Sequence, residues 1–143
     1  MGTVSVNQIL INPLKRIPVA GGDVLHGIRC SDQGYVDFGE AYFSVVEAGA
    51  VKAWKKHLRM TLNFVVPLGM VLFVFLDEQG GLREEELGEN RYMRLTVPPG
   101  IWFGFKGLFS PSSILMNLAD IPHDSTEVDR KDIGEINYNW KAK

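Results

Sequence analysis

Residues 97–105 (VPPGIWFGF) constrain the fold of this chain most, because they place two prolines and a glycine between strand-like stretches. Proline has no N–H group to donate, and glycine adopts backbone angles that other residues avoid. Pro98-Pro99-Gly100 therefore cannot lie within a helix or a central strand. The aromatic residues that follow predict that the chain re-enters a sheet. A strand, a Pro-Gly corner and an aromatic strand are typical of the double-stranded β-helix.

Length and composition set broad limits on the protein. A chain of 143 residues suits one core, so we expect residues 1–143 to form a single domain. The net charge of −2 does not indicate a nucleic-acid-binding surface. Cys30 is the only cysteine, which excludes an intrachain disulfide and a cysteine-rich zinc site. A lone thiol fits a reducing compartment such as the cytoplasm, and residues 1–12 lack the pattern of a signal peptide.

The most apolar stretch, residues 60–76, is too interrupted to predict a membrane span. Thr61, Asn63 and the turn at residues 67–69 divide it into two short pieces, whereas a spanning helix needs about 20 mostly apolar residues. We therefore expect two buried strands joined by a turn, and no membrane partner.

Short strands separated by turns dominate the remaining sequence. No segment of 12 or more residues keeps helical periodicity without a glycine or proline break, which predicts an all-β jelly roll or a related barrel. The acidic residues 82–90 predict a short helical turn or a solvated hairpin. The Gly-rich residues 1–40 predict an arm that packs on the barrel or on a partner. The expected strands are residues 41–46, 62–66, 70–76, 91–97, 102–105 and 113–119.

Three segments together resemble the dTDP-4-dehydrorhamnose 3,5-epimerase group of cupins and its shorter relatives in surface-polysaccharide gene clusters. Residues 69–77 (GMVLFVFLD) are similar to a family strand that contains Gly-x-Val and ends in Asp. Residues 97–105 are similar to the family's Pro-Pro-Gly-x-x-x-Gly-Phe corner, and residues 132–140 to its C-terminal tail. The resemblance spans about residues 20–140 and implies a cupin double-stranded β-helix.

The resemblance also implies a function. Family members are jelly-roll homodimers that bind a thymidine diphosphate sugar inside the barrel, and an N-terminal segment often crosses to the partner. An epimerase or isomerase of a nucleoside diphosphate 4-keto-6-deoxyhexose is therefore expected, with dTDP as the carrier. In such enzymes a base removes a proton next to the C4 ketone and an acid returns one on the opposite face. The site must then stabilise an enolate and hold a base that works near neutral pH.

The family's catalytic elements are only partly present in this sequence. The Arg-x-x-His element that carries the family's base falls on residues 52–55 (KAWK), and His57 follows two positions later. The family's catalytic tyrosine falls near Met116, and a lysine on the next strand falls on Leu62. These departures predict that the 3,5-epimerase chemistry is altered or lost.

Strand alternation places Lys55, His57 and Arg59 on one face. If that face lines the barrel, it forms a cationic wall suited to a diphosphate or an enolate. The alternative is an exposed edge strand on which lysine prevents aggregation. In the first case Lys55 and Arg59 bind phosphate or the enolate, and His57 is the expected base or carbonyl polariser. The resemblance to the family's tail implies that Asp132 orients His57.

Four further residues are candidates for substrate binding. Asn63 and Asn117 lie on apolar strands, where an amide needs a partner in a ligand or in the backbone. Trp102 either stacks on a base or sugar ring or packs in the core. His123 is either a second acid or base near the barrel mouth or a loop histidine capped by neighbouring aspartates.

The sequence predicts neither a metal site nor another cofactor. His57 stands alone in the first cupin metal-binding element, and Phe103 occupies the histidine place of the second. One imidazole cannot hold a transition metal without further donors.

Three functions remain compatible with the sequence. The first is the sugar isomerase described above, with a 3,4-ketoisomerase as a close variant. That cupin group uses two histidines on one strand, of which only His57 is present here. The second is a non-catalytic cupin that binds a nucleotide sugar or a carbohydrate, and the third is a purely structural dimerising domain.

Overall fold

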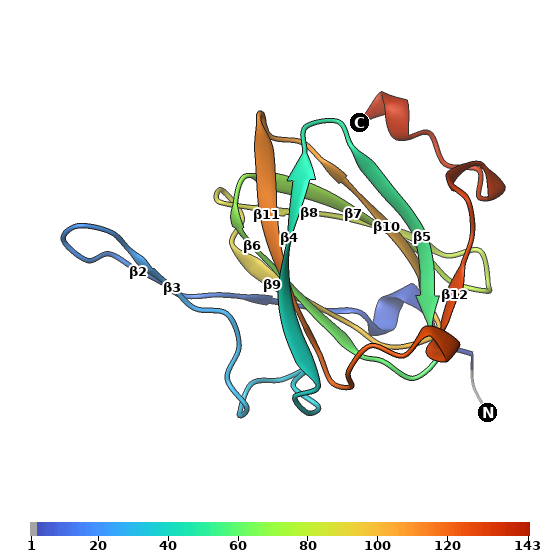
Figure 1. Cartoon of the computed structure of the whole chain (residues 1–143), viewed down its shortest axis with the longest axis horizontal. Coiled ribbons are helices and arrows are strands. Elements are labelled where there is room, and N and C mark those ends of the chain that lie inside the picture. The colour runs from blue at the N-terminus through green and yellow to red at the C-terminus, as the bar shows by residue number, and fades with distance from the viewer. Residues whose placement is uncertain (1–2) are drawn as a thin grey trace.

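Two five-stranded antiparallel sheets pack face to face across residues 3–143, the part of the chain that this computed structural model describes (Figure 1). The first sheet has the strand order β1-β9-β6-β11-β4, and the second has the order β12-β5-β10-β7-β8. This architecture confirms the predicted all-β cupin jelly roll. The strands are β1 (Leu10–Pro13), β2 (Arg16–Ile17), β3 (Val24–Leu25), β4 (Glu40–Glu47), β5 (Val51–His57), β6 (Leu62–Leu68), β7 (Met70–Leu76), β8 (Leu82–Gly88), β9 (Met93–Val97), β10 (Trp102–Gly107), β11 (Ser112–Ala119) and β12 (Val128–Arg130).

Helical structure within residues 3–143 is limited to single 3-10 turns, η1 (Val6–Gln8), η2 (Ser125–Glu127), η3 (Ile133–Glu135) and η4 (Trp140–Ala142). No helix in this range is long and apolar enough to cross a membrane. The apolar residues 60–76 form the buried strands β6 and β7, as predicted.

The Pro-Pro-Gly corner carries the chain from β9 in the first sheet to β10 in the second. Gly100 has a φ of +93°, which favours glycine, and its N–H donates a hydrogen bond of 2.7 Å to the carbonyl of His57. The corner therefore also fixes the end of β5, where His57 lies.

The acidic residues 82–90 differ from one of the two predictions made for them. They form no helical turn but contribute β8, which pairs with β7 in an antiparallel hairpin. Their side chains alternate between exposed and partly buried positions, because β8 is an edge strand of the second sheet.

Two separate apolar cores hold the molecule together. The larger core lies between the sheets and includes Phe64, Phe73 and Leu95, which are at most 2% exposed. The smaller one lies on the outer face of the second sheet, where the C-terminal residues 133–143 cover Trp54. The rings of Trp54 and Trp140 are 5.3 Å apart there. The C-terminal tail thus acts as a third layer behind β5.

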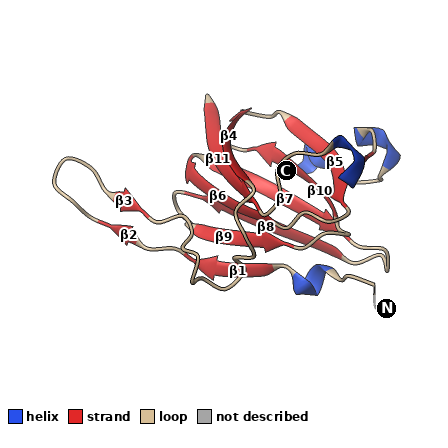
Figure 2. Cartoon of the chain, turned by 60° about the horizontal axis from the view of Figure 1, so that its bottom comes forward, coloured by secondary structure: helices blue, strands red, loops and turns tan. Residues whose placement is uncertain are grey.

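The N-terminal residues divide into a part bound to the barrel and a part that projects from it. Strand β1 pairs with β9 of the same chain, whereas the β2–β3 hairpin extends away from both sheets (Figures 1 and 2). Apolar side chains of the hairpin, including Val19 and Val24, are about half exposed.

Candidate active site

A cavity of about 740 Å³ lies between the two sheets. Strands β4 and β11 of the first sheet form one wall, and β5 and β12 of the second sheet form the other. The aromatic rings of Phe64, Phe103 and Phe105 line its inner part. The cavity therefore combines an apolar interior with polar side chains carried on both walls, as small-molecule sites do.

His57, the last residue of β5, is held in the cavity by a buried carboxylate. Its Nδ1 atom lies 2.5 Å from Oε1 of Glu127, whose side chain is 1% exposed. The other carboxylate oxygen accepts hydrogen bonds of 3.2 Å from the backbone N–H groups of Arg59 and Met60. The imidazole also stacks on Phe103, with ring centroids 5.9 Å apart. Both its position and its ring plane are thereby fixed.

The charge of Glu127 decides which nitrogen of His57 carries the proton. Burial alone raises the pKa of this carboxyl. The hydrogen bonds from His57 and from the two backbone N–H groups outweigh burial and hold the pKa below its ordinary value of 4.5. An ionised carboxylate can only accept, so Nδ1 of His57 donates to it, and in the neutral imidazole the free lone pair then belongs to Nε2. The arrangement is that of an oriented general base.

The second-sheet wall is strongly cationic. Lys52 and Lys55 of β5 and Arg130 of β12 line the cavity beside His57. Burial lowers the pKa of the Lys55 ammonium, and repulsion from Arg130 and Lys52 lowers it further. No ion pair is found for these three residues within the part of the chain that the structure describes, so their charges favour an anionic ligand.

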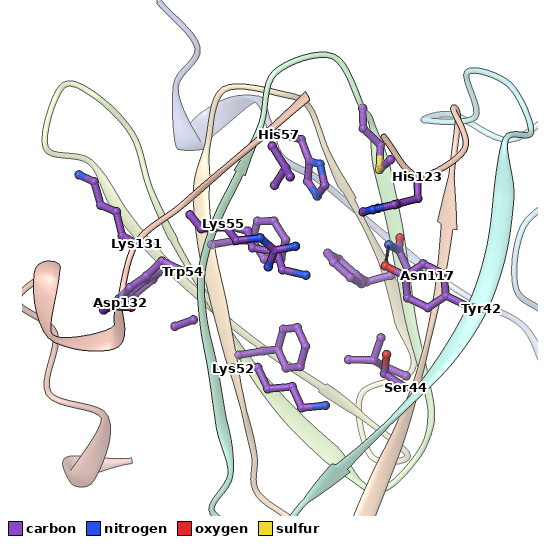
Figure 3. Close-up of a pocket in the computed structure, with 18 of the residues that line it drawn as sticks. Tyr42, Ser44, Lys52, Trp54, Lys55, His57, Asn117, His123, Lys131 and Asp132 are labelled. Atoms are coloured by element: carbon purple, nitrogen blue, oxygen red, sulfur yellow. Dashed lines mark hydrogen bonds between the residues drawn. The ribbon is translucent and has the colours of Figure 1, made fainter. Parts of the chain in front are cut away.

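The first-sheet wall carries neutral polar groups. Tyr42 and Ser44 of β4 and Asn117 of β11 line the cavity, and Figure 3 shows them on the side opposite His57 and Lys55. The Nδ2 group of Asn117 donates a 3.0 Å hydrogen bond to the hydroxyl of Tyr42. Oδ1 of Asn117 is buried and has no hydrogen-bond partner in the described structure.

This geometry corrects two sequence predictions, one about the residue that orients the base and one about a phosphate-binding residue. The carboxylate that contacts His57 is Glu127 and not Asp132. Asp132 precedes η3, and Figure 3 shows it beside Trp54 on the other side of β5. Arg59 does not continue the cationic face, because β5 ends at His57. Its guanidinium instead pairs with Asp124 at 3.0 Å, with 59% of the side chain exposed.

Asn63 and Trp102 lie outside the cavity, in contrast to the prediction. Asn63 faces away from the barrel interior. It accepts hydrogen bonds from Arg94 and Thr96 and donates to the carbonyl of Gly34, so all its polar groups are used within the fold. Trp102 packs in the smaller core, where the ammonium groups of Lys56 and Lys131 lie 5.2 and 4.7 Å from its ring centre. Its role is therefore packing.

Five of the predicted residues do line the cavity: Lys55, His57, Asn117, His123 and Asp132. His123 lies at its rim, where the backbone N–H donates to Glu40 at 3.1 Å. Residues 3–143 contain no group of three or more His, Cys, Asp or Glu side chains that could hold a metal ion.

The sequence reasoning missed Tyr42, Lys52, Glu127 and Arg130. Tyr42 could have been found, because alternation along residues 41–46 places it with Ser44 on the face opposite Phe43 and Val45. Glu127 and Arg130 come from a charged segment without periodicity, and nothing in the sequence predicts that it runs beside β5.

Comparison with known proteins assigns the chain to a family. No protein-family model matches the chain. The crystal structure of a dTDP sugar isomerase from Desulfovibrio desulfuricans G20 shares 36% sequence identity with it. The match covers 96% of this chain and 94% of that one, with a TM-score of 0.91. The chain belongs to the dTDP-sugar isomerase family. The family resemblance predicted from the three sequence segments is thereby confirmed.

More distant matches agree with this membership of a family of enzymes. The dTDP-4-dehydrorhamnose 3,5-epimerase of Sulfolobus tokodaii shares the fold, with a TM-score of 0.79 at 20% identity over 96% of this chain and 85% of that one. A probable low-salt glycan biosynthesis epimerase, Agl13, from Haloferax volcanii is 28% identical over 123 residues, which are 78% of this chain and 79% of the relative.

Proposed function

We propose that this protein is an isomerase or epimerase of a dTDP-linked 4-keto-6-deoxyhexose, and that it works in the cytoplasm in the synthesis of a surface glycan. The observation that carries the proposal is the buried His57–Glu127 pair at the edge of a cavity with a cationic wall. The name of the Desulfovibrio relative supports the nucleotide sugar, and that of the Haloferax relative supports glycan synthesis. The exposed free thiol of Cys30 fits a reducing compartment.

The proposed reaction is a proton transfer next to the C4 ketone. Nε2 of His57 takes the proton, and the electrons of the broken C–H bond form an enolate. The cationic side chains of Lys55 and Arg130 favour the negative charge that develops on oxygen. The ketone is restored when a proton returns to carbon. These steps involve side chains alone.

The experiment that tests the proposal follows solvent deuterium into dTDP-4-keto-6-deoxyglucose by NMR and mass spectrometry. The expected result is protein-dependent deuterium incorporation next to the ketone together with a new sugar isomer. A protein that binds TDP in a thermal-shift assay but catalyses neither exchange nor isomerisation would be a binding module, and the proposal would be wrong.

The cationic wall gives a prediction about nucleotide affinity. Changing Arg130 to glutamine is expected to weaken TDP binding by about tenfold, because charge-assisted hydrogen bonds contribute about 1.5–3 kcal/mol each. Isothermal titration calorimetry with TDP measures the effect. Arg59→Gln is the matched control and should bind TDP as the unchanged protein does, since the Arg59 guanidinium points to Asp124 outside the cavity. Equal losses in both variants would contradict this assignment of the phosphate contacts.

We also propose that residues 1–143 form a single cupin domain that assembles as a homodimer, with residues 1–40 contributing an arm. The β2–β3 hairpin is too short to be stable alone. The outer face of the edge strand β4 exposes Phe43 by 70% and Val45 by 58%. An exposed apolar patch on an edge strand fits a protein interface.

The dimer is tested by changing Phe43 to aspartate and measuring the molar mass by light scattering. Burying a carboxylate in an apolar interface is costly, so a shift from dimer to monomer is expected. Leu82→Asp is the matched control, because Leu82 is 52% exposed on β8 of the other sheet. A monomeric unchanged protein would exclude the homodimer.

A further inference from the structure

We propose that Tyr42 is the general acid that returns the proton to the sugar, and that Asn117 positions it. The inference rests on the proposed function and specifies its stereochemical course. It selects an epimerase, which inverts a carbon next to the ketone, over an isomerase that moves a proton along one face of the sugar.

The first observation is the placement of the two groups on different sheets. His57 ends β5 of the second sheet, whereas Tyr42 lies on β4 of the first sheet, and both line the same cavity. Figure 3 shows the two side chains on opposite sides of the space, with Asn117 beside Tyr42. A sugar ring held between the sheets therefore presents one face to each group.

The second observation is the hydrogen bond between Asn117 and Tyr42. Because Nδ2 of Asn117 donates to the Tyr42 oxygen at 3.0 Å, the amide uses one lone pair of the phenol and leaves its O–H free to donate elsewhere. The same contact stabilises the negative charge that remains on the oxygen after the proton has left. The described structure gives the Tyr42 hydroxyl no acceptor of its own.

The third observation is the unpaired oxygen of Asn117. This side chain is 2% exposed, and its Oδ1 atom has no partner within the described residues. A buried acceptor without a donor is costly, and a ligand hydroxyl next to it would satisfy it. The wall that carries Tyr42 is thus suited to contact the sugar, which has hydroxyl donors, whereas the cationic wall is suited to the diphosphate.

The chemical step balances without any further reactant. His57 takes a proton from the carbon next to the ketone, and the C–H electron pair becomes the enolate. The enolate carbon then forms a new C–H bond with the proton of the Tyr42 hydroxyl on the opposite face, and the ketone is restored. Tyr42 is 44% exposed, so water can return a proton to its oxygen, and His57 releases its own proton to solvent.

Tyr42→Phe separates the two half-reactions in deuterium oxide. The variant keeps His57, so deuterium should still enter the substrate next to the ketone, with the original configuration retained. Formation of the inverted product should fall by about 10²-fold or more, as expected for loss of a general acid. Asn117→Asp should likewise keep deuterium exchange and lose formation of the inverted product, because the aspartate accepts the phenolic proton and withholds it from the sugar. A residue with only a structural role would lose exchange and turnover together.

Tyr92→Phe is the matched control, because the Tyr92 hydroxyl donates to the carbonyl of His26 and lies outside the cavity lining. This variant should still form the inverted product. His123→Gln tests the alternative acid at the rim of the cavity. The proposal is overturned if Tyr42→Phe forms product at the unchanged rate, or if this variant loses deuterium exchange as well while remaining folded by circular dichroism. It is likewise overturned if His123→Gln, instead of Tyr42→Phe, keeps exchange and loses the inverted product. It is also overturned if the unchanged enzyme yields a product with retained configuration. Absence of any exchange in the unchanged enzyme would instead contradict the proposed function itself.

Discussion

Replacing His57 with alanine is expected to abolish both deuterium exchange and product formation, with a loss of about 10²-fold or more in each. His57 offers the only imidazole in the described cavity that is oriented by a buried carboxylate, so its removal takes away the first proton transfer. The affinity for TDP should change little, because the cationic wall remains. NMR exchange rates and calorimetry with TDP measure the two quantities.

Glu127→Gln should lower the exchange rate less than His57→Ala does. A glutamine amide has roughly the same size but places an NH₂ group against either His57 or the backbone N–H groups of Arg59 and Met60. The imidazole then loses its fixed tautomer, and exchange should fall by about 10- to 100-fold. His26→Ala is the control for both variants, since His26 lies outside the cavity lining. Full exchange activity in His57→Ala would rule out His57 as the base.

Replacing Trp54 with alanine is expected to cost about 3–5 kcal/mol of unfolding free energy, the range for truncating a buried tryptophan. Trp54 is 1% exposed and is the central side chain of the smaller core. Its indole N–H donates to the carbonyl of Ile133 at 3.3 Å, and its backbone pairs in both directions with Lys131. Loss of this ring therefore removes the surface on which the C-terminal tail packs.

Urea unfolding followed by circular dichroism measures the stability loss, and limited proteolysis detects release of the tail. Trp54→Phe should lose less, because an aromatic ring still fills most of the space. Lys141→Ala is the exposed control on the same tail and should leave stability nearly unchanged. A Trp54→Ala variant as stable as the unchanged protein would show that the smaller core does not hold the tail.

The fold could be predicted because its turns and strands are recognisable from residues that are neighbours in the sequence. Residues 97–105 combine a corner that excludes regular structure with an aromatic strand, and residues 60–76 divide at a turn into two strands. Both features follow from the backbone chemistry of proline and glycine and from side-chain alternation. The structure confirms them as β9, β10, β6 and β7.

The candidate site could be predicted only in part, because its residues meet through tertiary contacts. Lys55 and His57 share one strand, and alternation placed them on the same face. Arg59 was misplaced because the pattern does not reveal that β5 ends two residues earlier. Glu127 lies 70 residues from His57 in sequence, and only the pairing of β12 with β5 brings it to His57 in place of the predicted Asp132.

The hydrogen bonds of Glu127 connect the position of the proposed base with the stability of the native state at acidic pH. A carboxyl whose pKa is lowered by folding stabilises the native state above its ordinary value of 4.5, and this contribution disappears as the pH falls through the lower, folded value. Protonation would release the imidazole and the backbone after β5 in the same event. Acidification below the ordinary carboxyl value would therefore weaken the fold beside the proposed base as well as the reaction that depends on it.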